Sequence, residues 1–256
     1  MRLSFFPIVT VLLILSLTSG CEKDPYDDDQ YGNTCLVTKF RTPDQGSVTF
    51  DYDQHDFLSS FTQKSSTMPP ILMTVTYNNN IAFADYYADG QRLGSTEATL
   101  DSLGYIMQVE SEDSTGNNLG TWTLSYDTEH HLTHLHFYDF ANQKEVDIQI
   151  DWQDGNAVRF HTPNGTIDCQ YDNGVRSSLH LGSGNVALLS QLSIPNIAFC
   201  FSKDLLKTYD TQGVEIGEPI YVEYDFDSHD KVRKLFFSSS SGAIKGQTEV
   251  SYFCYD

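Results

Sequence analysis

A short unit recurs along most of this chain: an aromatic residue, an aspartate or another small polar residue, a tight turn, and then further apolar residues. Apolar and polar residues alternate on both sides of each turn, which is typical of two antiparallel strands with one buried face. The clear copies occupy residues 50–61, 124–137, 150–160, 167–179 and 222–237, and weaker copies occupy residues 85–94, 98–109 and 207–217.

The turns of these units support hairpins. Asp89-Gly90, Asp154-Gly155 and Asn173-Gly174 supply residues that readily adopt positive φ, as two-residue hairpin turns require. The chain also has 15 Tyr and 16 Phe, which suit strands. The sequence therefore predicts an all-β fold, an antiparallel meander of hairpins that forms a large twisted, curled or barrel-like sheet.

Two segments could form short helices. Residues 184–194 are rich in Leu and are followed by Pro195, which fits the end of a helix. Residues 202–209 could form a single helical turn. Neither segment is amphipathic over enough length to build a helical layer, so we expect at most one or two short helices at one end of the sheet.

The N-terminus predicts export. Arg2 precedes an apolar run over residues 5–17, and small residues lead to Cys21. The run is shorter than the roughly 20 residues that span a bilayer as a helix. With its basic start and small-residue exit, the segment is typical of a signal peptide over residues 1–20.

The residues around Cys21 resemble the lipobox of bacterial lipoproteins, which are cleaved before the cysteine and acylated on it. Thr18 departs from that motif, which usually has Leu at this position. An ordinary signal peptide with an incidental cysteine is the alternative. Residues 22–33 are acidic and lack apolar periodicity, so we expect residues 21–33 to be an acylated cysteine and a flexible tether. Residues 34–256 then form a single all-β repeat domain.

The charge balance excludes one class of partner. The net charge is -20, with only 15 Lys and Arg, and nucleic-acid binding needs clustered basic residues. No second apolar run of membrane-spanning length follows Cys21. We therefore expect no nucleic-acid partner and a membrane contact through the lipid anchor alone.

Four of the eight histidines lie in residues 130–136. Alignment of the units over residues 124–137 and 222–237 places His130 in a turn and His134 and His136 together on the outward face of a strand. Two such imidazoles can bind zinc or copper if His161 or a carboxylate supplies a third ligand. The other interpretation is a solvated hairpin.

Four cysteines follow Cys21, and an exported compartment permits disulfides. Cys35 and Cys254 lie near opposite ends of the predicted domain, so a bridge between them would join the first strand to the last. The alternative is that these cysteines are free and buried, as small apolar residues.

The sequence lacks the common motifs of catalysis and cofactor binding. The sequence has no Gly-rich phosphate loop, no Gly-x-Ser-x-Gly elbow and no His-Glu-x-x-His. We therefore expect no cofactor and no catalytic residue. The favoured hypothesis is a surface module that binds or scaffolds a glycan or a protein. The alternatives are an extracellular hydrolase using an Asp/His pair near residue 130, and a metal-binding protein.

The Tyr-Asp units resemble the YD-type repeats of bacterial surface proteins over about residues 48–237. With the Cys21 motif and the acidic tether, the chain resembles Bacteroidetes lipoproteins of unknown function that are described as having a porin-like fold. The resemblance implies a curled antiparallel sheet in an outer-membrane lipoprotein. The acidic tether resembles the surface-export signal of such proteins and implies the cell exterior, with the periplasmic face as the alternative.

That resemblance does not imply a pore. An outer-membrane barrel carries an apolar, lipid-facing band along every strand. Here the outward positions would place His134 and His136 in lipid.

Overall fold

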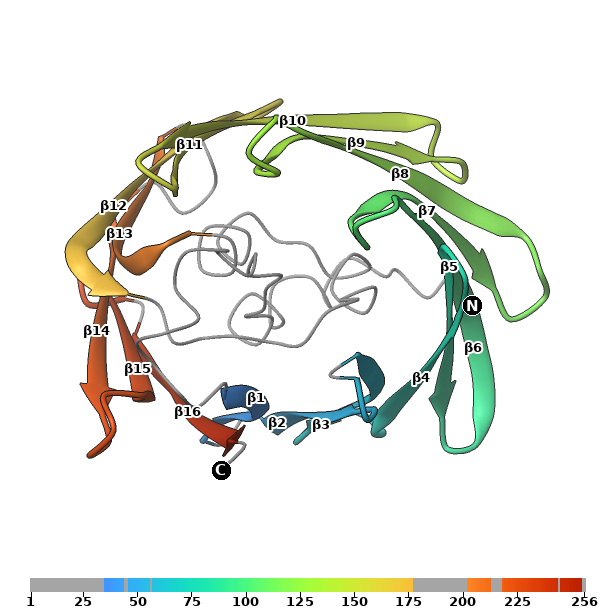
Figure 1. Cartoon of the computed structure of the whole chain (residues 1–256), viewed down its shortest axis with the longest axis horizontal. Coiled ribbons are helices and arrows are strands. Elements are labelled where there is room, and N and C mark those ends of the chain that lie inside the picture. Colours follow the sequence, from blue (N-terminus) through green and yellow to red (C-terminus); the bar gives the residue numbers. More distant parts are fainter. Residues whose placement is uncertain are drawn as a thin grey trace.

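The computed structural model describes residues 35–43, 46–55, 57–176, 202–212, 218–243 and 245–254. Within these residues sixteen strands follow one another along the chain (Figure 1). They are β1 (Cys35–Thr42), β2 (Gly46–Tyr52), β3 (Leu58–Ser65), β4 (Ile71–Asn78), β5 (Ile81–Ala88), β6 (Gln91–Leu100), β7 (Ile106–Asp113), β8 (Asn118–Tyr126), β9 (Leu132–Asp139), β10 (Lys144–Gln153), β11 (Asn156–Thr162), β12 (Gly165–Arg176), β13 (Asp204–Gln212), β14 (Ile220–Phe226), β15 (Val232–Ser239) and β16 (Lys245–Cys254).

Every strand pairs antiparallel with its neighbours in sequence, and β1 pairs with β16, so the sheet closes into a barrel (Figure 1). The prediction of an all-β antiparallel meander is confirmed. The sequence left open whether the curled sheet closes, and the β1–β16 pairing answers that question. None of the described residues belongs to a helix long and apolar enough to cross a membrane.

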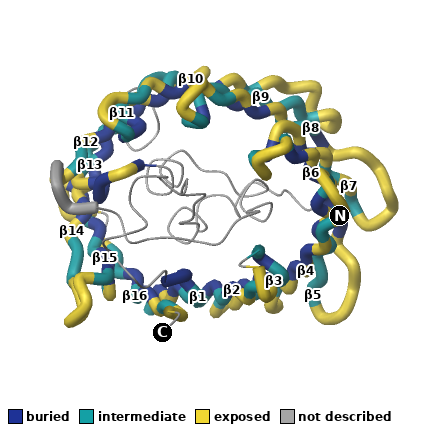
Figure 2. Tube along the Cα trace, viewed as in Figure 1, coloured by how far each residue is buried: buried dark blue, intermediate teal, exposed yellow. Residues whose placement is uncertain are grey.

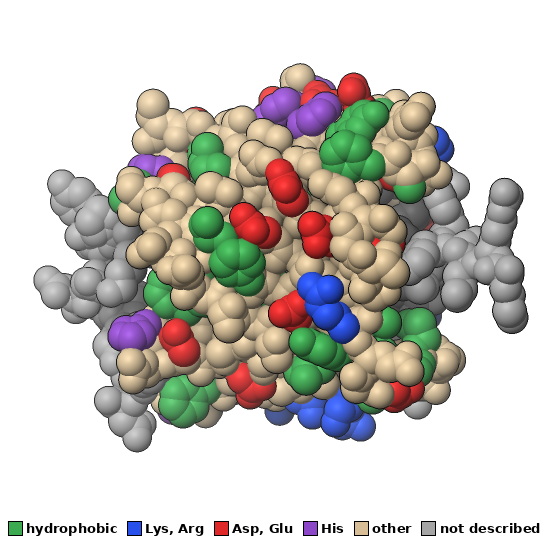
Figure 3. Space-filling model, turned by 90° about the vertical axis from the view of Figure 1, so that its right-hand side faces the viewer, with side chains coloured by type: hydrophobic (Ala, Val, Ile, Leu, Met, Phe, Trp, Pro, Cys, Tyr) green, Lys and Arg blue, Asp and Glu red, His purple; other side chains and the backbone are tan. Residues whose placement is uncertain are grey.

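The two faces of the wall differ in polarity. In β6, for example, Thr96, Ala98 and Leu100 are buried, whereas Glu97 and Thr99 between them are exposed. Buried positions occur on all sides of the ring (Figure 2), and the outer wall shows acidic and other polar side chains between smaller apolar groups (Figure 3). The period-two alternation therefore directs the apolar side chains to the inside of the barrel and the polar ones to the outside.

The aromatic residue of the recurring unit ties neighbouring strands together. In the second half of six even-numbered strands, its ring points inward and its O–H or N–H donates a hydrogen bond to a backbone carbonyl near the start of the preceding strand. These bonds are Tyr52 Oη to Val37 O (2.6 Å), Tyr77 Oη to Leu58 O (3.1 Å), Tyr126 Oη to Ile106 O (2.9 Å), Trp152 Nε1 to Leu132 O (2.9 Å), Tyr171 Oη to Ala157 O (2.8 Å) and Tyr224 Oη to Leu206 O (2.6 Å). They all lie at one end of the barrel, which we call the tyrosine end.

The aspartate of the unit closes the turn. Asp127 Oδ1 accepts the backbone N–H groups of Glu129 (2.8 Å) and His131 (2.9 Å). Asp53, Asp101 and Asp227 accept the equivalent pairs. Because the carboxylate satisfies two turn N–H groups, an Asp after the aromatic residue favours this turn.

The fourth residue of this turn adopts positive φ. It is Gly104 (φ 91°) in one turn, His130 (φ 65°) in the next and Asp230 (φ 58°) in a third. The alignment that placed His130 in a turn is thus confirmed. A type I turn followed by a left-handed residue is a common hairpin connection, so the spacing follows from backbone geometry.

Two of the three predicted two-residue turns are confirmed. Asp89-Gly90 has φ of 49° and 75°, and Asp154-Gly155 has φ of 53° and 79°. The prediction for Asn173-Gly174 is wrong, because these residues lie within β12 at a register shift between Asp172 and Arg176. A bulge tolerates an Asn-Gly pair as well as a turn does, and here the continued pairing of β12 with β13 prevails.

The helical predictions fare differently. Residues 202–209 do not form a helical turn, because residues from Asp204 onward belong to β13 and pair with β12. Pairing with the edge of β12 outweighs the helical preference of these residues. The segment 184–194 lies outside the described residues.

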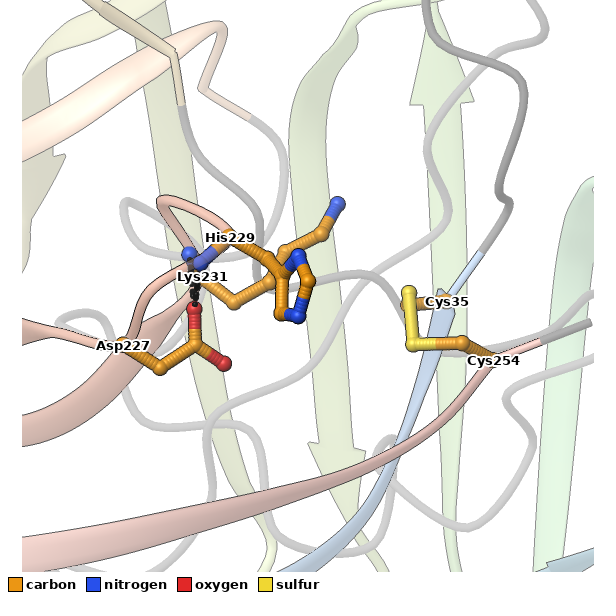
Figure 4. The surroundings of a disulfide bond; sticks show 5 residues. All are labelled: Cys35, Asp227, His229, Lys231 and Cys254. Carbon is orange, nitrogen blue, oxygen red and sulfur yellow. Dashed lines mark hydrogen bonds between the residues drawn. A yellow bond between two sulfur atoms is a disulfide. The ribbon is translucent and has the colours of Figure 1, made fainter.

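A disulfide joins Cys35 and Cys254 at the seam between β1 and β16, with the two sulfurs 2.03 Å apart. This is the pairing that the sequence suggested for the first and last strands. Figure 4 shows the bridge with the β14–β15 turn nearby. The free-cysteine alternative describes Cys169 instead, whose thiol is buried so that its pKa is raised to about 12. Cys200 lies outside the described residues.

The hydrogen bond from the aromatic ring to the neighbouring strand should be measurable. We expect Tyr126→Phe to lower the free energy of unfolding by about 1–2 kcal/mol, because the carbonyl of buried Ile106 loses its donor. Tyr221, which is 42% exposed on the outer wall, is the matched control, and Tyr221→Phe should change stability by less than about 0.5 kcal/mol. Urea denaturation followed by circular dichroism measures both. Equal effects of the two variants would contradict this role of the ring.

Candidate functional site

The outer wall over β9, β10 and β11 gathers the histidines that the sequence singled out. His134 and His136 project outward from β9, with side chains 38% and 37% exposed. The register places Asp147 opposite His136 and Gln149 opposite His134. On its other side Gln149 faces His161 of β11. The predicted outward orientation of His134 and His136 agrees with this geometry.

Asp147 connects the two β9 histidines. Its Oδ1 lies 2.6 Å from His134 Nε2 and 3.4 Å from His136 Nδ1. Because a carboxylate only accepts, the proton of the shorter bond resides on His134 Nε2, which donates it. Partial burial opposes ionisation of Asp147, but the hydrogen bonds and charges of His134 and then His136 outweigh it, so the pKa of Asp147 is lowered.

A second imidazole–carboxylate pair lies on the other side of Gln149. His161 Nε2 donates to Asp151 Oδ2 at 2.8 Å. His161 or a carboxylate was the candidate third ligand beside His134 and His136, and in this structure His161 is bonded to Asp151 instead of facing that pair. The two pairs lie diagonally about Gln149, which the register places opposite both His134 and His161.

This surface does not fit the hydrolase alternative. A general acid needs a raised pKa in a site that excludes water. The side chain of Asp147 is 48% exposed and its pKa is lowered rather than raised. The Asp/His pair near residue 130 is thus a solvent-exposed hydrogen-bonded pair on the outer wall.

A metal ion would have to displace existing bonds here. Of the residues that the structure describes, no group of three or more His, Cys, Asp or Glu side chains is arranged to hold one. His134 would also have to give up its 2.6 Å bond to Asp147 before Nε2 could coordinate. Whether His134 and His136 nevertheless bind a metal ion is a question for titration.

A buried polar cluster lies inside the wall at the β10–β11 turn. Asn156 and Asp204 exchange two hydrogen bonds of 2.9 Å, and Ser202 Oγ donates to Tyr171 Oη at 2.8 Å. Tyr171 in turn donates to the backbone of Ala157. These bonds pair the polar groups with one another and fasten the start of β13 to the neighbouring hairpin, which is a structural role.

Comparison with solved structures supports the fold. A porin-like protein from Bacteroides uniformis matches with a TM-score of 0.65 at 16% sequence identity, over 85% of this chain and 98% of that one. A porin-like protein from Bacteroides vulgatus matches at 13% identity over 83% of this chain and 80% of that one, with a TM-score of only 0.28. By sequence, no family model and no curated protein matches the chain.

The first of these similarities shows a shared porin-like fold, which is the fold that the resemblance of the sequence implied. At such low identity it carries nothing about activity or partners.

A zinc titration tests the histidine pair. We expect isothermal titration calorimetry of the chain with zinc to show no saturable one-to-one heat at micromolar protein, because both imidazoles are exposed and already bonded to Asp147. His134→Ala and the control His161→Ala should then behave like the unchanged chain. Stoichiometric heat that His134→Ala removes and His161→Ala keeps would establish a metal site instead.

Proposed function

We propose that this chain is an exported, non-catalytic lipoprotein, anchored through Cys21, whose barrel stands in water and binds a glycan or protein partner. The polarity of the outer wall carries this proposal. Exposed polar side chains face outward on strands around the ring: Arg41, Asp51, Thr74, Thr76, Glu97, Thr99, Gln108, Glu110, Thr123, Ser125, Asp147, Gln149, Asp151, Arg159, Gln170, Lys207, Glu223, Arg233 and Ser251.

A barrel that spans a bilayer needs the reverse arrangement. Its outward residues form an apolar band, and charged residues at mid-height cost about 2–4 kcal/mol each. Here the outward apolar residues are scattered, with Leu72, Phe83 and Tyr221 about 40% exposed. The buried apolar residues lie on the other face of the strands. This polarity favours a wall surrounded by water, so membrane attachment would have to come from another part of the chain.

Cys21 supplies that attachment in our proposal. The apolar run, the lipobox-like residues and the acidic segment 22–33 support acylation followed by a tether. The shared fold with a porin-like protein is compatible with such an arrangement, because fold does not dictate environment. We place the domain at the outer membrane facing the cell exterior, and the periplasmic face is the alternative.

The partner surface that we favour lies at the end of the barrel opposite the tyrosine end. Leu119 and Phe140 are each 45% exposed there, and the Tyr138 and Phe140 rings contact edge to face with centroids 5.0 Å apart. Glu145 of β10 lies opposite Tyr138. An aromatic platform beside a carboxylate can stack on a sugar ring and accept hydrogen bonds from its hydroxyl groups, or bind an apolar side chain of a protein.

Replacement of Cys21 separates an anchored barrel from an inserted one. In an exporting Gram-negative host, the unchanged chain should incorporate labelled palmitate and enter the detergent phase of Triton X-114. Cys21→Ser should remain unlabelled and enter the aqueous phase, because the outer wall is polar. If Cys21→Ser stayed in carbonate-washed membranes, or formed conducting channels in planar bilayers, the barrel itself would sit in lipid and the proposal would be wrong.

The partner surface can be tested with the aqueous Cys21→Ser chain on a glycan array and in pull-downs with surface proteins. We expect binding that Phe140→Ser weakens about tenfold or more, since loss of a central aromatic contact typically costs 1–3 kcal/mol or more. Phe83→Ser, which removes a ring of similar exposure from the wall of β5, is the matched control and should leave binding unchanged. Binding to no glycan and no protein would remove the binding role.

A further inference from the structure

Both ends of the described barrel chain leave the wall at the tyrosine end. Strand β1 begins there with Cys35, and β16 finishes there with Cys254, to which Cys35 is bonded. Figure 4 shows the β14–β15 turn, with Asp227, His229 and Lys231, in the surroundings of the same bridge. Because the disulfide locks this exit point, the segment that runs back to Cys21 must start from the tyrosine end.

The length of that segment limits which end of the barrel can approach the membrane. Residues 22–34 separate Cys21 from Cys35, and they can span at most about 50 Å when fully extended. As a flexible tether, they would have a root-mean-square length of about 20 Å. Strand β7 (Ile106–Asp113) alone is about 25 Å long. Contact between the opposite end and the bilayer would therefore require the tether to run back along the wall and to stretch beyond its root-mean-square length.

The tyrosine end offers exposed apolar side chains at its turns. Leu103 in the β6–β7 turn is 65% exposed, Phe253 beside the disulfide is 53% exposed and Phe226 at the end of β14 is 37% exposed. Leu and Phe side chains of this kind enter the boundary between lipid headgroups and acyl chains. Each contact is weak by itself, but a short tether holds the end at a millimolar effective concentration relative to the bilayer surface.

The negative charge of the tyrosine end determines which lipid headgroups it can approach. Asp53, Asp101, Asp127 and Asp227 cap turns at the tyrosine end, and each accepts two backbone N–H groups there. These carboxylates oppose an anionic bilayer and are indifferent to a zwitterionic one. The fitting surface is therefore a bilayer of neutral net headgroup charge.

We infer that the barrel stands on the membrane with its tyrosine end against a zwitterionic lipid surface, in contact through Leu103, Phe226 and Phe253, so that the opposite end with Leu119 and Phe140 points away from the cell envelope. This inference rests on the acylation of Cys21 that we propose above.

Two serines provide matched reporter positions. Ser102 and Ser114 each follow the capping Asp of a turn of the same type, and both are exposed. They lie at the two ends of β7, Ser102 at the tyrosine end and Ser114 at the opposite end. Cys169 is buried and should not react with a maleimide probe. Because Cys200 lies outside the described residues, the reporters are made in a Cys200→Ser background of the acylated chain, where Ser102→Cys and Ser114→Cys each provide one labelling site.

The experiment uses the labelled full chains in phosphatidylcholine vesicles that contain a headgroup nitroxide lipid. We expect both chains to float with the vesicles, and the probe at residue 102 to be quenched at least threefold more than the probe at residue 114. Leu103→Ser combined with Phe253→Ser should reduce that ratio toward one without releasing the chain. Phosphatidylglycerol should reduce it as well.

The outcomes separate the two proposals. If the acylated chains float but residue 114 is quenched as strongly as residue 102, or more strongly, the orientation is wrong and the anchor stands. If the apolar replacements leave the ratio unchanged, the contact through Leu103 and Phe253 is wrong. If the chains do not float with the vesicles, or if the Cys21→Ser variant floats as well as they do, the proposed lipid anchor is wrong.

Discussion

Six hairpins carry an inward-facing Tyr or Trp near the end of their second strand, and in each the ring donates a hydrogen bond to a backbone carbonyl of the preceding strand. The bond at Tyr224, 2.6 Å from the carbonyl of Leu206, is among the shortest. It forms only if the ring points inward, so it fixes which side chains of the strand face the interior. A slip of one residue would turn the whole apolar set outward and break the bond. The aspartate that follows then caps the turn, and local and long-range preferences agree.

The same alternation gives this barrel a polar outer wall, whereas barrels that span a bilayer carry an apolar band on theirs. Sixteen strands close with an apolar interior face and a charged exterior one, although the fold is shared with a porin-like protein. Successive residues of a strand face opposite sides of the wall. Moving the hydrophobic residues of each strand by one position would therefore exchange the apolar and polar faces, while the pattern of strand pairing could stay the same. The barrel architecture therefore does not by itself determine whether the outer wall is polar or apolar.

The hairpins and their turns could be predicted from the sequence because they depend on neighbouring residues. His130 was placed in its turn by alignment alone, and its φ of 65° agrees. Asn173-Gly174 and residues 202–209 were misjudged because the β12–β13 pairing decides their structure, and the residues that pair are far apart in the chain. The closure of the sheet depends on strands at opposite ends of the chain, which no local pattern encodes.

The candidate site was predicted in part. The outward positions of His134 and His136 follow from alternation within β9. Their shared partner Asp147 follows from the β9–β10 register. That register depends on the turn over residues 140–143, which was not predicted from the sequence. The choice of His161 for Asp151 is likewise a matter of cross-strand geometry, so the sequence offered His161 as a ligand that the register assigns elsewhere.

The seam between β1 and β16 has a consequence for how the molecule is made. Its two cysteines are separated by 219 positions, and β1 is the first of the described strands to be synthesised. Until the last strand arrives, β1 presents an unsatisfied edge that any β16, including that of a neighbouring molecule, could pair with. Partly folded chains at high concentration could therefore exchange strands into oligomers, and formation of the Cys35–Cys254 bond would commit each copy to its own last strand.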